Sequence, residues 1–110
     1  MRIVSTYRRG YQILKIDEDL TLNSDITDLR TIVEDYVQKG PINIALEFTK
    51  DSYLYTKSIA VLVQCLETIQ EHGGRMAVIA PNRDIVDVLE TIGFINLVKI
   101  YGSEEDVGKG

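Results

Sequence analysis

Two hydroxyl side chains, Thr56 and Ser58, stand where a predicted strand gives way to a predicted helix. They follow a polar and aromatic stretch, residues 49–55, and open a run whose apolar residues recur at helical spacing. One interpretation is structural, because a hydroxyl at a helix start accepts hydrogen bonds from unpaired backbone N–H groups. The other is regulatory, because a helix N-terminus also accommodates the dianion of a phosphorylated hydroxyl. Residue chemistry by itself leaves both interpretations open.

The side chains that usually perform catalysis are sparse. The one histidine, His72, falls in the last turn of a predicted helix, where a cation complements the helix dipole. The one cysteine, Cys65, lies on the flank of the same helix, where a lone cysteine usually packs as a small hydrophobic residue. No glycine-rich phosphate loop is present, and the three adjacent carboxylates at residues 104–106 lack a His or Cys partner. We therefore expect no enzyme active site, no metal site and no cofactor.

The composition is that of one globular domain, residues 1–110, with 45% hydrophobic and 26% charged residues. Seventeen acidic against twelve basic residues give a net charge of −5, which argues against nucleic-acid binding. A single cysteine excludes an internal disulfide. No apolar run reaches the roughly 18 residues of a membrane span, and the first residues lack the pattern of a signal peptide. We expect a cytoplasmic protein without a membrane-bound part.

Alternating and continuous apolar runs predict five strands, two of them joined by a hairpin turn at Arg9-Gly10. The run at residues 76–80 is apolar throughout, which is typical of a strand covered on both faces. The predicted strands are residues 3–7, 11–16, 42–48, 76–80 and 97–100.

Apolar residues at helical spacing predict three helices between these strands. The first follows a cap at Asn23 or Ser24 and stops at the sequence Lys39-Gly40-Pro41. The second starts at Thr56 and ends at Gly73-Gly74, with the first glycine left-handed. The third is capped by Asn82, turns Ile85, Val88, Leu89 and Ile92 inward, and closes at Gly93. A further helical turn could start at residues 103–106.

The element order is therefore β-β-α-β-α-β-α-β, with one more helical turn at the end. Right-handed crossovers between the later strands require a mostly parallel sheet of four to five strands, with helices packed on it. The predicted fold class is mixed α/β.

Several strings along the chain, in this order, resemble the STAS domain of anti-sigma-factor antagonists. Residues 11–16 with Asp19-Leu20-Thr21 are similar to the family's second strand and its Gly-Glu-Leu-Asp stretch. Residues 42–48 are similar to its central strand, and residues 53–62 fall where the family carries Tyr-Met-Asp-Ser-Ser-Gly-Leu-Gly-Val-Leu. Residues 73–78 and 88–94 match its Gly-Gly before the next strand and its Leu-x-x-x-Gly-Leu helix end. The resemblance runs over residues 2–107.

The resemblance implies a regulatory binding module rather than an enzyme. Typical members bind an anti-sigma factor that is also a serine kinase, and the kinase phosphorylates the hydroxyl that follows the family's Asp. Here Asp-Ser-Ser-Gly is replaced by Tyr55-Thr56-Lys57-Ser58, so the Asp and the Gly are lost. Thr56 takes the acceptor position, and Ser58 is the second candidate. The expected partner-binding residues are Tyr55, Thr56, Lys57, Ala60, Val61 and Gln64.

Other functions remain open. A divergent member that builds a stressosome-like scaffold, or another STAS interaction subunit, would act without phosphorylation. The partner could be another STAS-containing regulator, and a homodimer is a further alternative. A small-ligand or nucleotide-binding domain is the third class, and the missing phosphate loop argues against it.

Overall fold

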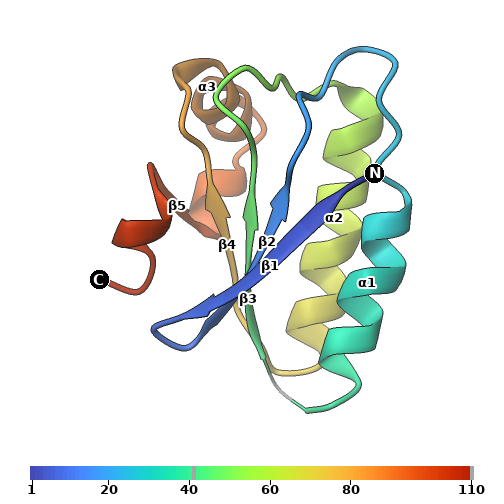
Figure 1. Ribbon diagram of the computed structural model, residues 1–110, viewed down its shortest axis with the longest axis vertical. Coiled ribbons are helices and arrows are strands. Elements are labelled where there is room, and N and C mark those ends of the chain that lie inside the picture. The colour runs from blue at the N-terminus through green and yellow to red at the C-terminus, as the bar shows by residue number, and fades with distance from the viewer. Residues whose placement is uncertain (41, 110) are drawn as a thin grey trace.

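Five strands form one sheet whose spatial order follows the chain order, β1-β2-β3-β4-β5 (Figure 1). The computed structural model describes residues 1–40 and 42–109. Strand β1 pairs antiparallel with β2, whereas β2, β3, β4 and β5 pair parallel. The predicted mostly parallel sheet is therefore confirmed. The strands are β1 (Ile3–Arg8), β2 (Tyr11–Ile16), β3 (Asn43–Glu47), β4 (Met76–Ile79) and β5 (Lys99–Tyr101).

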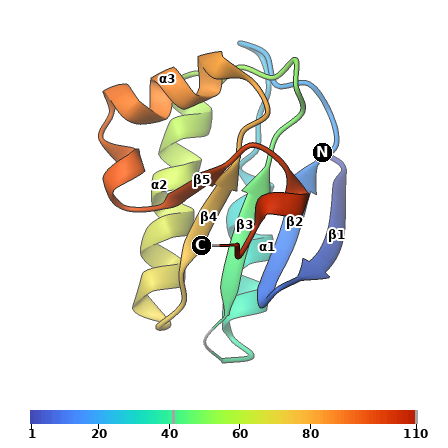
Figure 2. The ribbon, with the colours of Figure 1, turned by 90° about the vertical axis from the view of Figure 1, so that its left-hand side faces the viewer.

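The helices complete the predicted alternation. They are α1 (Asp28–Val37), α2 (Thr56–Glu71) and α3 (Arg83–Thr91), followed by the 3₁₀ turns η1 (Phe94–Asn96) and η2 (Glu104–Asp106). Helices α1 and α2 lie side by side against one face of the sheet, and α3 lies near the carboxyl end of β4 (Figure 1). The C-terminal turn η2 lies over the opposite face (Figure 2). No helix within the described residues is long and apolar enough to cross a membrane.

The sheet buries different residues on its two faces because successive strand side chains point to opposite sides. The face toward the helices carries most of the core, including Leu14, Leu46 and Val78, each 0% exposed. The other face has a smaller cluster in which Ala45 and Ala77 pack with Val107 from the C-terminal segment. Strand β4 is buried at all four positions, which confirms its predicted two-sided cover.

The β1–β2 turn and the end of α2 fall where the sequence predicts them, and both have left-handed residues. Arg9 and Gly10 have φ angles of 49° and 84°, so both central residues of the β1–β2 turn are left-handed. Gly73, with φ 80°, ends α2 as predicted.

Several predicted details at the element ends differ from the structure, and the ends of β1, β3 and β4 each shift by one residue. Helix α1 begins at Asp28, and neither Asn23 nor Ser24 caps it. The Ser24 hydroxyl instead accepts the Thr21 N–H at 2.8 Å, which closes a turn before the helix. Ile92 was expected to point inward but is 44% exposed, because α3 ends at Thr91. Strand β5 begins at Lys99, so Leu97 lies outside it.

Other expectations at element ends are met. Asn82 caps α3, since its side chain accepts the Ile85 N–H at 2.8 Å. The turn expected at residues 103–106 is η2. Pro41, which the sequence predicts to help stop α1, lies outside the described residues.

Candidate functional site

Thr56 is the first residue of α2, and its side chain is exposed. The preceding Tyr55 is extended, with φ −103° and ψ 170°, and its side chain makes no capping hydrogen bond. The first turn of α2 contains no acidic residue. Unpaired N–H groups and the helix dipole give such an N-terminus a partial positive charge. An anion on the Thr56 hydroxyl would therefore be placed at an electrostatically favourable position.

Hydrogen bonds from the β2–α1 loop fix the segment that leads into Thr56. Ser52 is 3% exposed, and its hydroxyl accepts the Leu20 N–H at 2.9 Å. Thr49 Oγ1 lies 2.7 Å from the Ser52 Oγ. The Thr49 hydroxyl donates to a carboxylate oxygen of Asp19 at 2.6 Å. The backbone N–H of Tyr53 donates to the Leu20 carbonyl at 3.0 Å. The loop before α2 is thus tied to a neighbouring loop by side chains and backbone.

The start of α3 holds the same segment from its other side. The Asn82 amide nitrogen donates to the carbonyls of Lys50 at 3.0 Å and Ser52 at 2.8 Å. Asn82 caps α3 as predicted, and its bonds to the loop before α2 are a second role that the sequence does not indicate. The hydrogen-bonding roles of Ser52, Thr49 and Asp19 are likewise absent from the predicted site. No local sequence signal points to this network, because the burial of Ser52 arises only when the two loops meet.

A groove of about 400 Å³ runs between the beginnings of α1 and α2. Four of the predicted partner-binding residues line it: Lys57, Ala60, Val61 and Gln64. The opposite wall comes from the segment before α1 and its first turn. The residues of that wall are Asp25, Ile26, Thr27 and Arg30. The structure therefore gathers most of the predicted binding residues into one surface.

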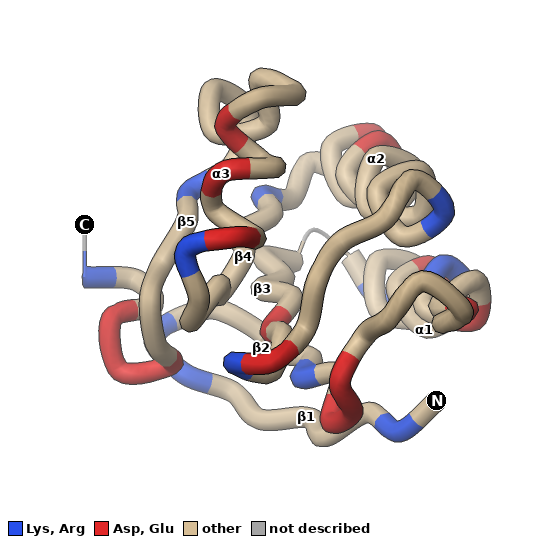
Figure 3. The backbone as a smooth tube through the Cα atoms, turned by 90° about the horizontal axis from the view of Figure 1, so that it is seen from above, with Lys and Arg blue, Asp and Glu red and all other residues tan. Residues whose placement is uncertain are grey.

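Charges of both signs lie around this groove. The pKa of Asp25 is lowered, mainly by hydrogen bonds from the Thr27 side chain and backbone, with a smaller contribution from the Lys57 charge. In Figure 3, which looks down on the end of the molecule where α2 begins, basic and acidic positions are interspersed. This pattern differs from the continuous positive field of a nucleic-acid-binding surface.

The other two predicted partner-binding residues, Tyr55 and Thr56, are not among the residues that line the groove. The Tyr55 ring packs edge-on against Tyr53 with the centroids 4.8 Å apart, and the side chains are 37% and 38% exposed. Tyr53 lines a separate hollow of about 400 Å³ together with residues of α3. The two aromatic rings form an exposed ridge beside the start of α2.

Two predicted site residues are less accessible than expected. Ser58 is 2% exposed, because position 58 lies on the buried side of the first turn of α2. Its hydroxyl is therefore a poor target for a kinase in the folded protein. Val61 is 7% exposed, so it contributes to the floor of the groove rather than to an open contact surface.

Cys65 and His72 do not form a site together. Cys65 is 1% exposed, and burial raises the pKa of its thiol to about 12. His72 lies exposed at the end of α2, with Nδ1 2.8 Å from the Thr68 carbonyl. A thiol held protonated in the core is an inert packing group.

Glu47, the last residue of β3, is a further notable group that is absent from the predicted site residues. It is 8% exposed, and its Oε1 has no hydrogen-bond partner among the described residues. Burial, together with the neighbouring Glu104 carboxyl, raises the pKa of Glu47 to about 7. A glutamate that directly follows three apolar strand residues, Ile44, Ala45 and Leu46, is the sequence signal for such a group.

Comparisons with known proteins agree on one family. A model described as the STAS domain matches residues 3–107. A Thermotoga maritima protein, provisionally named an anti-sigma factor antagonist, is 26% identical over 89 residues. The aligned region covers 81% of this chain and 79% of that protein.

Solved structures share the fold at low sequence identity. A STAS domain protein from Planctomyces limnophilus has a TM-score of 0.76 at 14% identity, covering 97% of this chain and 95% of its own. The anti-sigma factor antagonist SpoIIAA in its unphosphorylated form has a TM-score of 0.73 at 13% identity, covering 98% of this chain and 95% of its own. The phosphorylated form of SpoIIAA, from Bacillus, has a TM-score of 0.71 at 13% identity, covering 98% of both chains.

Proposed function

Because the chain belongs to the STAS domain family, we propose that it is a regulatory protein that binds an anti-sigma factor with kinase activity. Proteins of the anti-sigma factor antagonist family are regulatory binding proteins rather than typical enzymes. In this proposal Thr56 is the phosphorylation site and the groove between α1 and α2 is the docking surface. The protein acts in the cytoplasm and without a cofactor.

The observation that carries the proposal is the exposed Thr56 at the uncapped start of α2. A phosphate there would accept hydrogen bonds from free N–H groups of the first turn and would be favoured by the helix dipole. Lys57 adds a neighbouring cation. The phosphorylated domain would therefore stay folded, and the switch would act on binding rather than on stability. The match to SpoIIAA in both its unphosphorylated and phosphorylated forms supports this assignment.

The docking surface follows from the position of Thr56 beside the groove. A partner that covers Lys57, Ala60 and Gln64 would also cover the first turn of α2. Burying a phosphate dianion at such a contact costs several kcal/mol when the partner supplies no cation of its own, since Lys57 alone compensates only part of the charge. A loss of about 2.7 kcal/mol already lowers affinity about a hundredfold, which is enough for an on–off switch.

The test begins with the tagged protein in lysate of its source cell, with mass spectrometry of captured proteins and of phosphorylated residues. The captured kinase is then titrated with Thr56→Ala, which should bind like the wild type, and with Thr56→Glu, which should bind about a hundredfold more weakly. Thr91→Glu is the matched control, because Thr91 is an exposed helical threonine at the end of α3. Equal binding by all three variants would remove Thr56 from the switch.

The stability of Thr56→Glu separates binding from folding. A carboxylate in the first turn of a helix is favourable by about 0.3–1 kcal/mol. The variant should therefore be at least as stable as the wild type, so weaker binding would not result from unfolding. A second function, a scaffold subunit that acts without phosphorylation, would show as a large homo-oligomer in light scattering and no phosphate on Thr56.

A further inference from the structure

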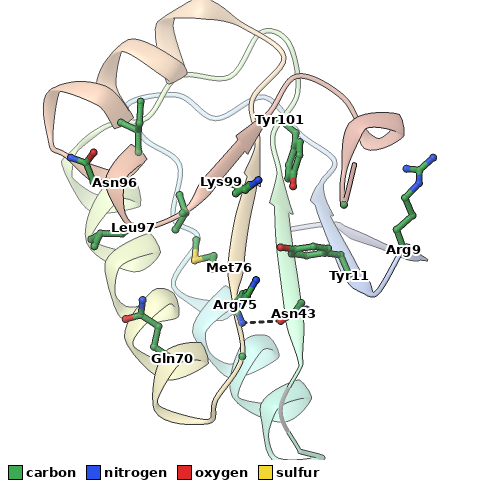
Figure 4. Close-up of a pocket in the computed structure, with 14 residues that line it drawn as sticks. Arg9, Tyr11, Asn43, Gln70, Arg75, Met76, Asn96, Leu97, Lys99 and Tyr101 are labelled. Atoms are coloured by element: carbon green, nitrogen blue, oxygen red, sulfur yellow. Dashed lines mark hydrogen bonds between the residues drawn. The ribbon is translucent and has the colours of Figure 1, made fainter. Parts of the chain in front are cut away.

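A cavity of about 600 Å³ opens beside the amino ends of the parallel strands (Figure 4). The first residues of four adjacent strands line it: Tyr11, Asn43, Met76 and Lys99. Thr56 follows the carboxyl end of β3, whereas these residues stand at the amino ends of parallel strands. The cavity is therefore a separate site on the same domain.

The cavity collects positive charge in an acidic protein. Arg9, Arg75 and Lys99 line it, and no Asp or Glu does, although the chain carries a net charge of −5. Within residues 1–40 and 42–109, the ion pairs are formed by Arg2 and Arg83. The three cations of the cavity thus have no carboxylate partner in this part of the chain.

The sheet register places two of these cations on one face. Lys99 lies opposite Ala77 of β4. Arg75 lies just before β4 and two residues before Ala77, and its carbonyl still accepts the Ile44 N–H at 2.9 Å, so the alternation of the extended chain places Arg75 on the same side as Ala77. The backbone N–H of Arg75 donates to the side-chain oxygen of Asn43 at 3.0 Å, and this bond fixes the backbone at Arg75. Arg9 is occupied differently, since its guanidinium donates to the carbonyls of Glu105 at 2.6 Å and Val107 at 3.1 Å. Arg75 and Lys99 are the cations available to a ligand.

Two tyrosines complete the wall. In Figure 4 the hydroxyl ends of Tyr11 and Tyr101 point toward the region where Arg75 and Lys99 lie. Burial raises the pKa of Tyr11, Tyr101 raises it further, and the Arg75 charge lowers it. The Tyr11 hydroxyl therefore stays protonated at neutral pH and is available as a hydrogen-bond donor. The rings also offer half-buried apolar surface to the uncharged part of a ligand.

We propose that this cavity binds a small organic phosphate monoester, with the phosphate on Arg75 and Lys99 and the organic group against Tyr11 and Tyr101. A phosphate dianion matches two unpaired cations, and guanidinium and hydroxyl groups donate to its oxygens. The cavity volume lies within the range of small-molecule sites, roughly 300–1,000 Å³. This site lies at the amino ends of the parallel strands, whereas Thr56 follows the carboxyl end of β3.

Phenyl phosphate and inorganic phosphate are the probes, each titrated into the full chain at constant ionic strength and followed by calorimetry and by amide NMR shifts. We expect phenyl phosphate to bind at least tenfold more tightly than inorganic phosphate, with shifts at residues 9–11, 75–77 and 99–101. The double variant Arg75→Gln/Lys99→Gln should lose at least tenfold in affinity.

Lys50→Gln is the matched control, because Lys50 is an exposed lysine beyond the carboxyl end of β3. It should bind phenyl phosphate like the wild type. Circular dichroism and thermal unfolding establish that each variant is folded before its affinity is compared. The proposal is overturned by equal affinity for the two probes, by equal binding in the double variant, or by no binding at about 10 mM of either probe.

Discussion

The amide nitrogen of Asn82, at the start of α3, donates to the carbonyl of Ser52 in the loop before α2 at 2.8 Å. The oxygen of the same amide accepts the Ile85 N–H at 2.8 Å and so caps α3. One side chain therefore joins the start of one helix to the segment that positions Thr56 at the start of another. The candidate phosphorylation site depends on a residue 26 positions away in sequence, from Thr56 to Asn82.

Replacing Asn82 by Ala should loosen this segment and destabilise the protein. The variant loses a helix cap and two bonds to carbonyls, so we expect a loss of about 2 kcal/mol in chemical denaturation. Hydrogen exchange should quicken at residues 52–57. The control is Asn23→Ala, since Asn23 is exposed and caps no helix. Unchanged exchange at residues 52–57 would show that Asn82 does not position the loop.

Ser58 and Thr56 should respond oppositely to a negative charge. Ser58→Asp places a carboxylate at a side chain that is 2% exposed, and we expect a loss of about 3 kcal/mol or more in denaturation. Ser58→Ala should be nearly neutral. Thr56→Glu should leave the protein at least as stable as the wild type. A Ser58→Asp variant as stable as wild type would contradict the burial of this side chain.

Glu47 should make stability depend on pH. Its pKa is raised from 4.5 to about 7 in the folded protein, so between these values the folded state binds more protons than the unfolded state. Stability contributed by the protonated carboxyl is therefore fully present below about pH 4.5 and is lost as the pH rises through about 7. In Glu47→Gln this loss should disappear.

Urea denaturation at pH 5, 6, 7 and 8 measures this effect as the difference between Glu47→Gln and the wild type. The variant should gain stability over the wild type as the pH rises. Glu67→Gln is the control, because Glu67 is exposed on α2, and its difference from the wild type should not follow this course. A constant difference for Glu47→Gln over the whole range would rule out a titrating Glu47.

Gly74 should tolerate no side chain. A Cβ atom there would stand 2.0 Å from the carbonyl oxygen of Ile42 and 3.1 Å from Ile69 Cγ2. Gly74→Ala must push the start of β4 away from the segment before β3, and we expect a loss of about 3 kcal/mol. Gly102→Ala is the matched control, since nothing lies within 4 Å of its added Cβ. Similar melting temperatures for the two variants would contradict the close approach at Gly74.

Local patterns in the sequence determined the order and type of the elements. The hairpin signal at Arg9-Gly10 predicted β1 and β2, and alternating apolar residues predicted β3. An apolar run predicted the two-sided burial of β4, and Asn82 predicted the start of α3. These features depend on neighbours within a few residues. The helix start at Thr56 belongs to the same class, because a polar loop followed by a run of period 3.6 marks it.

Tertiary structure decided which side chains are buried, which hydroxyls are already hydrogen-bonded and which charges lie together. Ser24 does not cap α1, because its hydroxyl is already used by Thr21, and Ser58 is buried although it stands two residues from the exposed Thr56. The Glu47 pKa and the grouping of Arg75 with Lys99 arise only when distant segments meet across the sheet. A sequence records which residues are adjacent along the chain. Burial, electrostatics and cavities depend on which residues are adjacent in space.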